Sequence, residues 1–119
     1  MKKTVVLGAS PNPSRFANMA VKRLTSEGIE AIPVGIRDGE IVGIPILKGQ
    51  PMIENVDTIT LYIGPQRQPP YYDYILDLKP NRIIFNPGTE NPELMQLAAS
   101  EGIDTELGCT LVMLSTATY

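Results

Sequence analysis

The sequence contains no histidine, no tryptophan and a single cysteine. Without histidine the chain cannot build a Ser-His-Asp triad, a Cys-His dyad or a histidine-ligated metal site. One cysteine excludes an internal disulfide bond and a zinc site made of several thiolates. We therefore expect no metal, no catalytic residues, and a ligand-binding protein that is not an enzyme.

Long apolar runs are also missing. No stretch approaches the ~18 to 20 consecutive apolar residues of a membrane span. The apolar run that begins at Thr4 is too short for the hydrophobic region of a signal peptide. The 119 residues fit one domain, so we expect a single domain over residues 1–119, located in the cytoplasm.

The charges are distributed unevenly along the chain. The net charge is −3, yet the first 26 residues hold five basic residues and no acidic one. The simplest explanation is a solvated helix face, and the alternative is a compact anionic ligand near the amino-terminal loop. Extended nucleic acid is not expected as a partner, because the chain has few aromatic residues and no long basic run.

Short apolar segments alternate with amphipathic ones. We expect strands over 4–7, 31–34, 58–63, 82–85 and 104–107, and a short strand within 41–47. The helices are expected to bury Ala17, Ala20, Val21 and Leu24; Tyr72, Ile75 and Leu76; and Leu94, Leu97 and Ala98. The apolar tail 110–114 suits either a strand or a helix. This alternation predicts an α/β, Rossmann-like, doubly wound and mainly parallel sheet with helices on both faces.

Asn-Pro pairs precede the first and the last of these helical patterns. Asn12 is expected to cap the first helix, with Pro13 in its first turn, and Asn91-Pro92 opens the other. Gly28 stands where a left-handed residue commonly ends a helix.

The segments that follow the expected strands are rich in Gly, Pro, Ser and Asn. They are 8–12, 33–35, 64–65 and 86–88. Each has ordinary loop composition when it is taken alone. Doubly wound sheets bind ligands beyond the carboxyl ends of their strands, so four such loops at one edge predict a ligand site there.

The first of these loops excludes some nucleotides. Ser10 and Pro13 replace the second and third glycines of a GxGxxG fingerprint, and no acidic residue ends the second strand. NAD and flavin therefore fit poorly, and a P-loop is absent. Backbone amides at a helix start, with Ser10, Asn12 and Arg15, still favour a phosphate group. The alternative is that Ser10 and Asn12 only cap a turn.

Several short motifs share their order with a known family. They are Gly8–Pro13 with Arg15, Pro33-Val34, Gly43, Val56-Asp57, Asn86–Asn91, Gly102-Ile103 and Cys109-Thr110. Their order and spacing resemble those of the small single-domain CoA-binding proteins, which are similar to the amino-terminal CoA-binding domain of the succinyl-CoA synthetase α subunit. The likeness runs from residue 3 to residue 115, and differs at Phe16 and Ala17, where many members carry proline and a hydroxyl residue.

The resemblance implies that the carboxyl edge of the sheet holds coenzyme A (CoA) or an acyl-CoA. The residues implied for the phosphates are Gly8, Ser10, Asn12 and Arg15, with Ala9 in the same loop. Those implied for the adenosine are Pro33, Val34 and Gly35, and those for the pantetheine arm are Ile63, Gly64 and Pro65. Asn86, Pro87 and Gly88 are implied to close the site. The expected role is regulatory, adaptor or carrier binding, with no protein partner indicated.

Cys109 follows Gly108 at the end of the last expected strand, with acidic rather than basic neighbours in sequence. We expect an inert, half-buried cysteine; the alternative is a thiol that exchanges with CoA disulfide or takes a persulfide. Two other functions stay open for the whole chain. One is a small NAD- or flavin-dependent oxidoreductase, and the other is an interaction protein that has lost its ligand.

Overall fold

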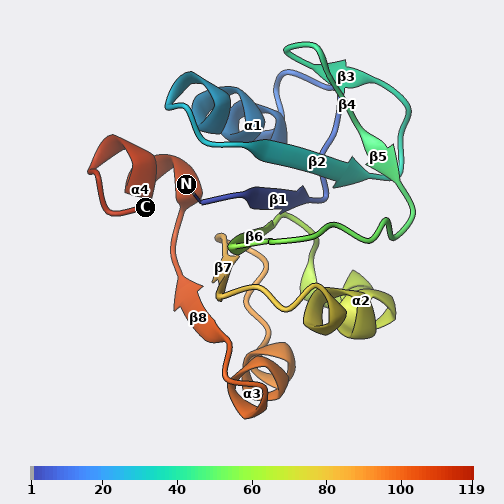
Figure 1. Ribbon diagram of the computed structural model, residues 1–119, viewed down its shortest axis with the longest axis vertical. Coiled ribbons are helices and arrows are strands. Elements are labelled where there is room, and N and C mark those ends of the chain that lie inside the picture. Colours follow the sequence, from blue (N-terminus) through green and yellow to red (C-terminus); the bar gives the residue numbers. More distant parts are fainter. Residues whose placement is uncertain (1) are drawn as a thin grey trace.

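The computed structural model describes residues 2–119, and its main sheet has six parallel strands. In spatial order they are β5 (Leu47–Lys48), β2 (Ala31–Gly35), β1 (Thr4–Leu7), β6 (Thr58–Leu61), β7 (Arg82–Phe85) and β8 (Asp104–Leu107). The chain runs outward from β1 to β5 and then returns to the other side of β1 with β6 (Figure 1). The predicted Rossmann-like, doubly wound α/β fold is confirmed.

Helices cover both faces of this sheet. The helices α1 (Phe16–Ser26) and α4 (Thr110–Ser115) lie on one face, and α2 (Tyr72–Asp77) and α3 (Pro92–Ser100) lie on the other (Figure 1). Successive side chains of a strand point to opposite faces. Val5 and Leu7 of β1 accordingly pack in the cluster under α2 and α3, while Val6 packs under α1.

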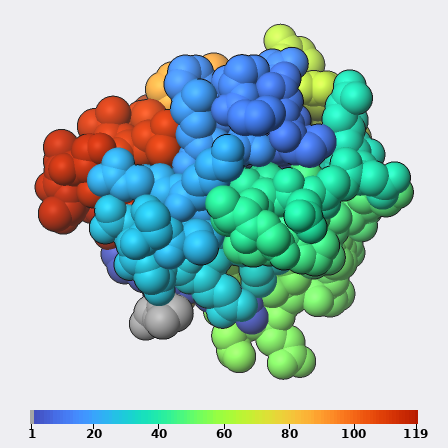
Figure 2. All heavy atoms as spheres, turned by 90° about the horizontal axis from the view of Figure 1, so that it is seen from above, coloured from blue at the N-terminus to red at the C-terminus, as the bar shows by residue number. Residues whose placement is uncertain are grey.

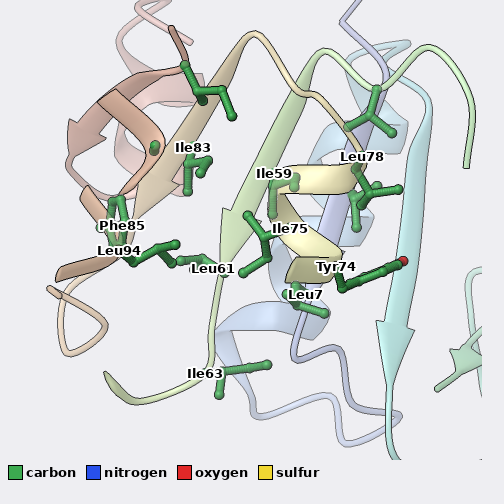
Figure 3. Packing of buried hydrophobic residues seen from close by; sticks show 14 of the residues in the cluster. Leu7, Ile59, Leu61, Ile63, Tyr74, Ile75, Leu78, Ile83, Phe85 and Leu94 are labelled. Carbon is green, nitrogen blue, oxygen red and sulfur yellow. The ribbon is translucent and has the colours of Figure 1, made fainter. Parts of the chain in front are cut away.

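The cluster under α2 and α3 is the larger of the two. Figure 3 shows Tyr74 and Ile75 of α2 lying against Ile59, Leu61 and Leu7 of the central strands. On the other face, α1 packs between α4 and the segment that carries β3 (Glu40–Ile41), as Figure 2 shows from above. The centre of the sheet, where β1 and β6 pair, is therefore covered on both faces.

Three local expectations are refined by the structure. The 41–47 region forms a hairpin of β3 and β4 (Ile44–Pro45), which turns at Val42 and Gly43, and then the edge strand β5. The strand expected over 58–63 ends at Leu61, and the ambiguous tail is the helix α4. Within residues 2–119, no helix combines the length and hydrophobicity needed to cross a membrane.

The expected cap of the first helix was wrong. The helix α1 begins at Phe16, with Arg15 at the N-cap position and no side-chain cap. The segment from Asn12 instead closes a turn, in which Arg15 N donates to Asn12 O at 3.1 Å, so Asn12 lies one turn too early. The parallel expectation for Asn91 is confirmed, since its side chain accepts hydrogen bonds from the amides of Glu93 and Leu94 at the start of α3. The helix-ending role of Gly28 is also confirmed by its φ of 78°.

Candidate ligand site at the carboxyl edge of the sheet

The strand order places four loops side by side at the carboxyl edge. These loops follow β2, β1, β6 and β7, which are neighbours in that order. The order reverses between β1 and β6, and Tyr62 N donates to Leu7 O at 2.8 Å where the two chains leave the sheet. A doubly wound sheet leaves its crevice at such a reversal, so the candidate site lies above β1 and β6.

Two glycines let these loops approach closely. Gly8 has a φ of 102°, and a Cβ atom on it would lie 3.0 Å from Ile63 Cγ1 and from the backbone of Tyr62. A Cβ atom on Gly35 would lie 2.2 Å from Ala9 O. The loop after β1 is therefore wedged between the loops after β2 and β6, and side chains at these glycines would push the three apart.

The loop after β1 satisfies its own amides in this structure. Ser10 Oγ accepts from Asn12 N at 3.1 Å, and Asn12 Oδ1 accepts from Ser14 N at 3.0 Å and from Ser14 Oγ at 2.8 Å. Because Ser10 Oγ acts only as an acceptor in that bond, its own proton remains available to a ligand. Ser10 and Asn12 thus cap a turn, and Ser10 also keeps a donor.

The amino terminus of α1 points its free amides at the same edge. The first bond of the helical pattern runs from Met19 N to Arg15 O at 3.1 Å, so the amides of residues 16–18 precede it. No side chain caps this end within residues 2–119, and its first turn holds no acidic residue. An uncapped helix start carries partial positive charge, which favours an anion beside the exposed Arg15.

Asn18 of α1 anchors the loop after β1, and this role was not predicted from the sequence. Its side chain is 2% exposed, and Nδ2 donates to Ser10 O at 2.9 Å. Its Oδ1 atom is buried without a hydrogen-bond partner among residues 2–119. A polar residue on an otherwise apolar helix stripe was the signal in the sequence, because such a residue needs a specific partner when it is buried.

The residues implied for the adenosine and the arm lie at this edge, but mostly with buried side chains. Pro33 and Val34 are buried within β2, and Val34 belongs to the core cluster, so only the backbone at Gly35 reaches the edge. Ile63 is likewise in the core, while Gly64 and Pro65 are half-buried at the start of a 3-10 turn (Pro65–Arg67). These residues shape the floor of the site.

Asn86 is engaged inside the fold. Its Nδ2 donates to Thr60 Oγ1 at 2.7 Å and to Leu61 O at 2.8 Å, and its Oδ1 accepts from Thr110 N at 2.9 Å. The side chain therefore ties β6, β7 and α4 together and has no free donor for a ligand. The following residues, Pro87 and Gly88, are exposed at the rim.

Comparison with known families decides what kind of domain this is. A family model described as a CoA binding domain matches residues 2–115. The chain belongs to this family. The predicted resemblance to small CoA-binding proteins is thereby confirmed.

Solved structures share the fold of this CoA binding domain. A crystal structure of an uncharacterized protein is 55% identical, covers 100% of this chain and 98% of its own, and has a TM-score of 0.98. A protein from Thermus thermophilus is 23% identical, with 99% and 90% covered and a TM-score of 0.87. A conserved hypothetical protein from Pyrococcus furiosus is 25% identical, with 90% and 93% covered and a TM-score of 0.78. Among curated proteins, none matches the chain.

Cys109 of the CoA binding domain lies at the far side of the site. It is half-buried, as predicted, and occupies the N-cap position of α4 just beyond the carboxyl end of β8. The neighbouring Tyr62 is a phenol whose burial raises its pKa to about 12, so it stays uncharged at physiological pH. Within residues 2–119, no ion pair involves Cys109, and whether the thiol reacts stays a prediction to be tested.

Proposed function

We propose that the protein binds CoA or an acyl-CoA without acting on it chemically, as a regulatory, adaptor or carrier module. The observation that carries this proposal is the uncapped start of α1 beside Arg15 at the reversal of strand order. It offers a diphosphate both free amides and a guanidinium at the place where doubly wound folds bind nucleotides. Family membership supports CoA as the nucleotide.

The end of β2 supports a ribose that carries a phosphate. Folds that select NAD place an acidic residue there to bind the free ribose hydroxyls. Here the strand ends at Gly35, and the next residues are Ile36 and the basic Arg37. The following carboxylate, Asp38, pairs with Lys48 at 2.7 Å. Between Gly35 and Asp38, a 3′-phosphate, as in CoA, therefore meets no carboxylate that lacks a basic partner.

The proposal that the protein is not catalytic rests on the hydrogen bonds and positions of two carboxylates. The carboxylate of Glu90 accepts from Gly88 N at 2.9 Å within its own turn. Burial acts to raise the pKa of Asp57, but hydrogen bonds from Asn81 and Thr58 and the charge of Arg82 outweigh it and hold that pKa below its usual value. Asp57 precedes β6, so this perturbed carboxyl lies at the opposite edge of the sheet from the ligand site.

Native mass spectrometry of freshly purified protein, followed by calorimetry, tests the proposal. The expected results are an added mass equal to that of CoA or an acyl-CoA, and saturable binding of CoA to protein stripped of ligand. Protein that binds no adenine nucleotide would point to an interaction protein that has lost its ligand. A flavin or nicotinamide absorbance band in the pure protein would favour the oxidoreductase.

Arg15→Glu is expected to weaken CoA binding about tenfold to hundredfold. The substitution turns an attractive charge into a repulsive one at the phosphates, and charge-assisted hydrogen bonds contribute roughly 1.5 to 3 kcal/mol. Titration calorimetry measures the change. Lys22→Glu, an equal charge reversal on an exposed part of the same helix, serves as the control and should change affinity little. Equal losses in both variants would show that only net charge matters.

Cys109→Ser is expected to leave CoA affinity within about threefold, because a structural thiol makes no bond to the ligand. The variant should melt at a lower temperature, since a half-buried hydroxyl needs a partner that a thiol does not. Thermal denaturation and calorimetry measure the two effects. Rapid alkylation of Cys109 in the folded protein, blocked by CoA, would contradict this prediction and favour thiol exchange.

A further inference from the structure

Gln68 is a polar side chain with no exposed surface, placed between two short 3-10 turns in the loop after β6. Its Nε2 atom donates to Ile63 O at 2.9 Å and to Thr89 O at 2.8 Å. Its Oε1 atom accepts from Asn91 Nδ2 at 2.8 Å. Both amide protons and one acceptor position are therefore used in the interior.

These bonds join two segments that belong to different strands. Residues 62–71 follow β6, and residues 86–91 follow β7. Among residues 2–119, the two hydrogen bonds that connect these segments, to Thr89 and from Asn91, both involve Gln68. Gln68 therefore acts as a cross-link that sets the spacing between the two loops.

The partners of Gln68 are themselves held firmly. Asn91 caps α3 and also donates to Tyr72 Oη at 2.8 Å, and the tyrosine in turn donates to Glu93 at 2.9 Å. Thr89 Oγ1 donates to Asn86 O at 2.8 Å. Prolines flank the glutamine at positions 65, 69 and 70, which reduces the freedom of its own segment. The cross-link thus connects two stiff segments.

We infer that Gln68 is a positioning residue: its hydrogen bonds fix the loops after β6 and β7 at the spacing needed for the pantetheine arm of the ligand. This inference rests on the proposed function, because residues 63–65 on the first loop are the ones implied for the arm, and residues 86–88 on the second are implied to close the site. The adenosine and phosphates are proposed to contact the loops after β1 and β2, to which Gln68 makes no hydrogen bond. Gln68 therefore serves one end of the ligand only.

The test compares CoA with adenosine 3′,5′-bisphosphate, which carries the nucleotide end without the arm. Gln68→Met keeps the volume of the side chain and leaves Ile63 O, Thr89 O and Asn91 Nδ2 without their partner. We expect its affinity for CoA to fall by about tenfold or more, because buried polar groups without partners force the loops to rearrange. Its affinity for the bisphosphate should stay within about twofold of the wild-type value.

Gln66→Met is the matched control, because Gln66 is exposed on the adjacent turn and should change neither affinity. If Gln68→Met does not fold, Asn91→Ser replaces it. Serine still caps α3, but its shorter side chain loses the bonds that Asn91 Nδ2 makes to Gln68 Oε1 and Tyr72 Oη. The same split between the two ligands is expected on a smaller scale.

Parallel losses for both ligands, or no loss for either, would overturn the inference and leave Gln68 with a purely structural role or none. Measurements on the wild-type protein distinguish this result from a failure of the proposed function. If the wild-type protein binds neither CoA nor the bisphosphate, the proposed function itself fails. If it binds CoA and the variant shows no split, only the positioning role fails.

Discussion

Gly35→Ala is expected to destabilise the protein by about 3 kcal/mol or more and to lower its melting temperature by roughly ten degrees. The added methyl group would lie 2.2 Å from Ala9 O, which is a backbone atom in a buried part of the loop after β1. Either β2 or this loop has to move. Movement of the loop would also strain the bonds from Gly8 N and Ala9 N to Val34 O, at 2.9 and 3.0 Å.

Gly64→Ala provides the matched control for this substitution. Gly64 has a φ of −62°, which any residue adopts, and its Cβ atom would make only an ordinary contact at 3.5 Å with the end of the Gln66 side chain. We expect a change in the free energy of unfolding within about 0.5 kcal/mol. Thermal denaturation of the two variants in parallel measures the difference. A Gly35→Ala protein as stable as the wild type would show that the two loops are not packed as described.

CoA is expected to raise the melting temperature more than NAD, NADP, ADP or ATP at equal concentration. At a concentration a hundred times its dissociation constant, a ligand stabilises the folded state by about 2.7 kcal/mol, which corresponds to roughly ten degrees for a domain of this size. CoA alone among these ligands combines an adenosine 3′-phosphate with a pantetheine arm. The β2 end lacks the acidic residue that selects NAD, and Gly64 and Pro65, the residues implied for the arm, carry no polar side chain.

A thermal shift series across these five ligands measures this preference. Arg15→Glu should reduce the shift produced by CoA. Such a reduction would attribute the stabilisation to binding at the loop after β1 and not to a nonspecific effect of solute or ionic strength. An equal shift with NAD would leave the fold unchanged and would remove the assignment of CoA as the preferred ligand.

The strands and helices were predictable because burial leaves a local pattern. The runs at 4–7 and 82–85 are apolar after their first residues, Thr4 and Arg82, as is typical of strands covered on both faces, and those apolar residues are all buried. Asn91 was predictable because its cap is made within three residues. The prediction that Asn12 caps α1 was wrong because an Asn-Pro pair is compatible with a turn as well as with a helix start. Only the packing of α1 decides between the two.

The parts of the site that the sequence did not predict depend on distant partners. Gln68 in a proline-rich segment has the composition of an exposed loop until Thr89 and Asn91, more than 20 residues away, are known to face it. The same holds for Asn86, which is implied to close the site but whose side chain forms hydrogen bonds with Thr60 and Thr110. Hydrogen bonds between distant loops leave no periodic signal, whereas apolar faces do.

The central position of β1 bears on the order in which the chain acquires its shape. Thr4 in β1 pairs with Thr58 in β6, which lies 54 residues further along the sequence. Contacts of such wide separation close late, because a long loop must first lose its freedom. A nascent chain that ends before β6 has the loops on one side of the candidate ligand site and lacks those on the other side. The complete candidate site therefore forms only after β6 has been synthesised and the two halves of the sheet have joined.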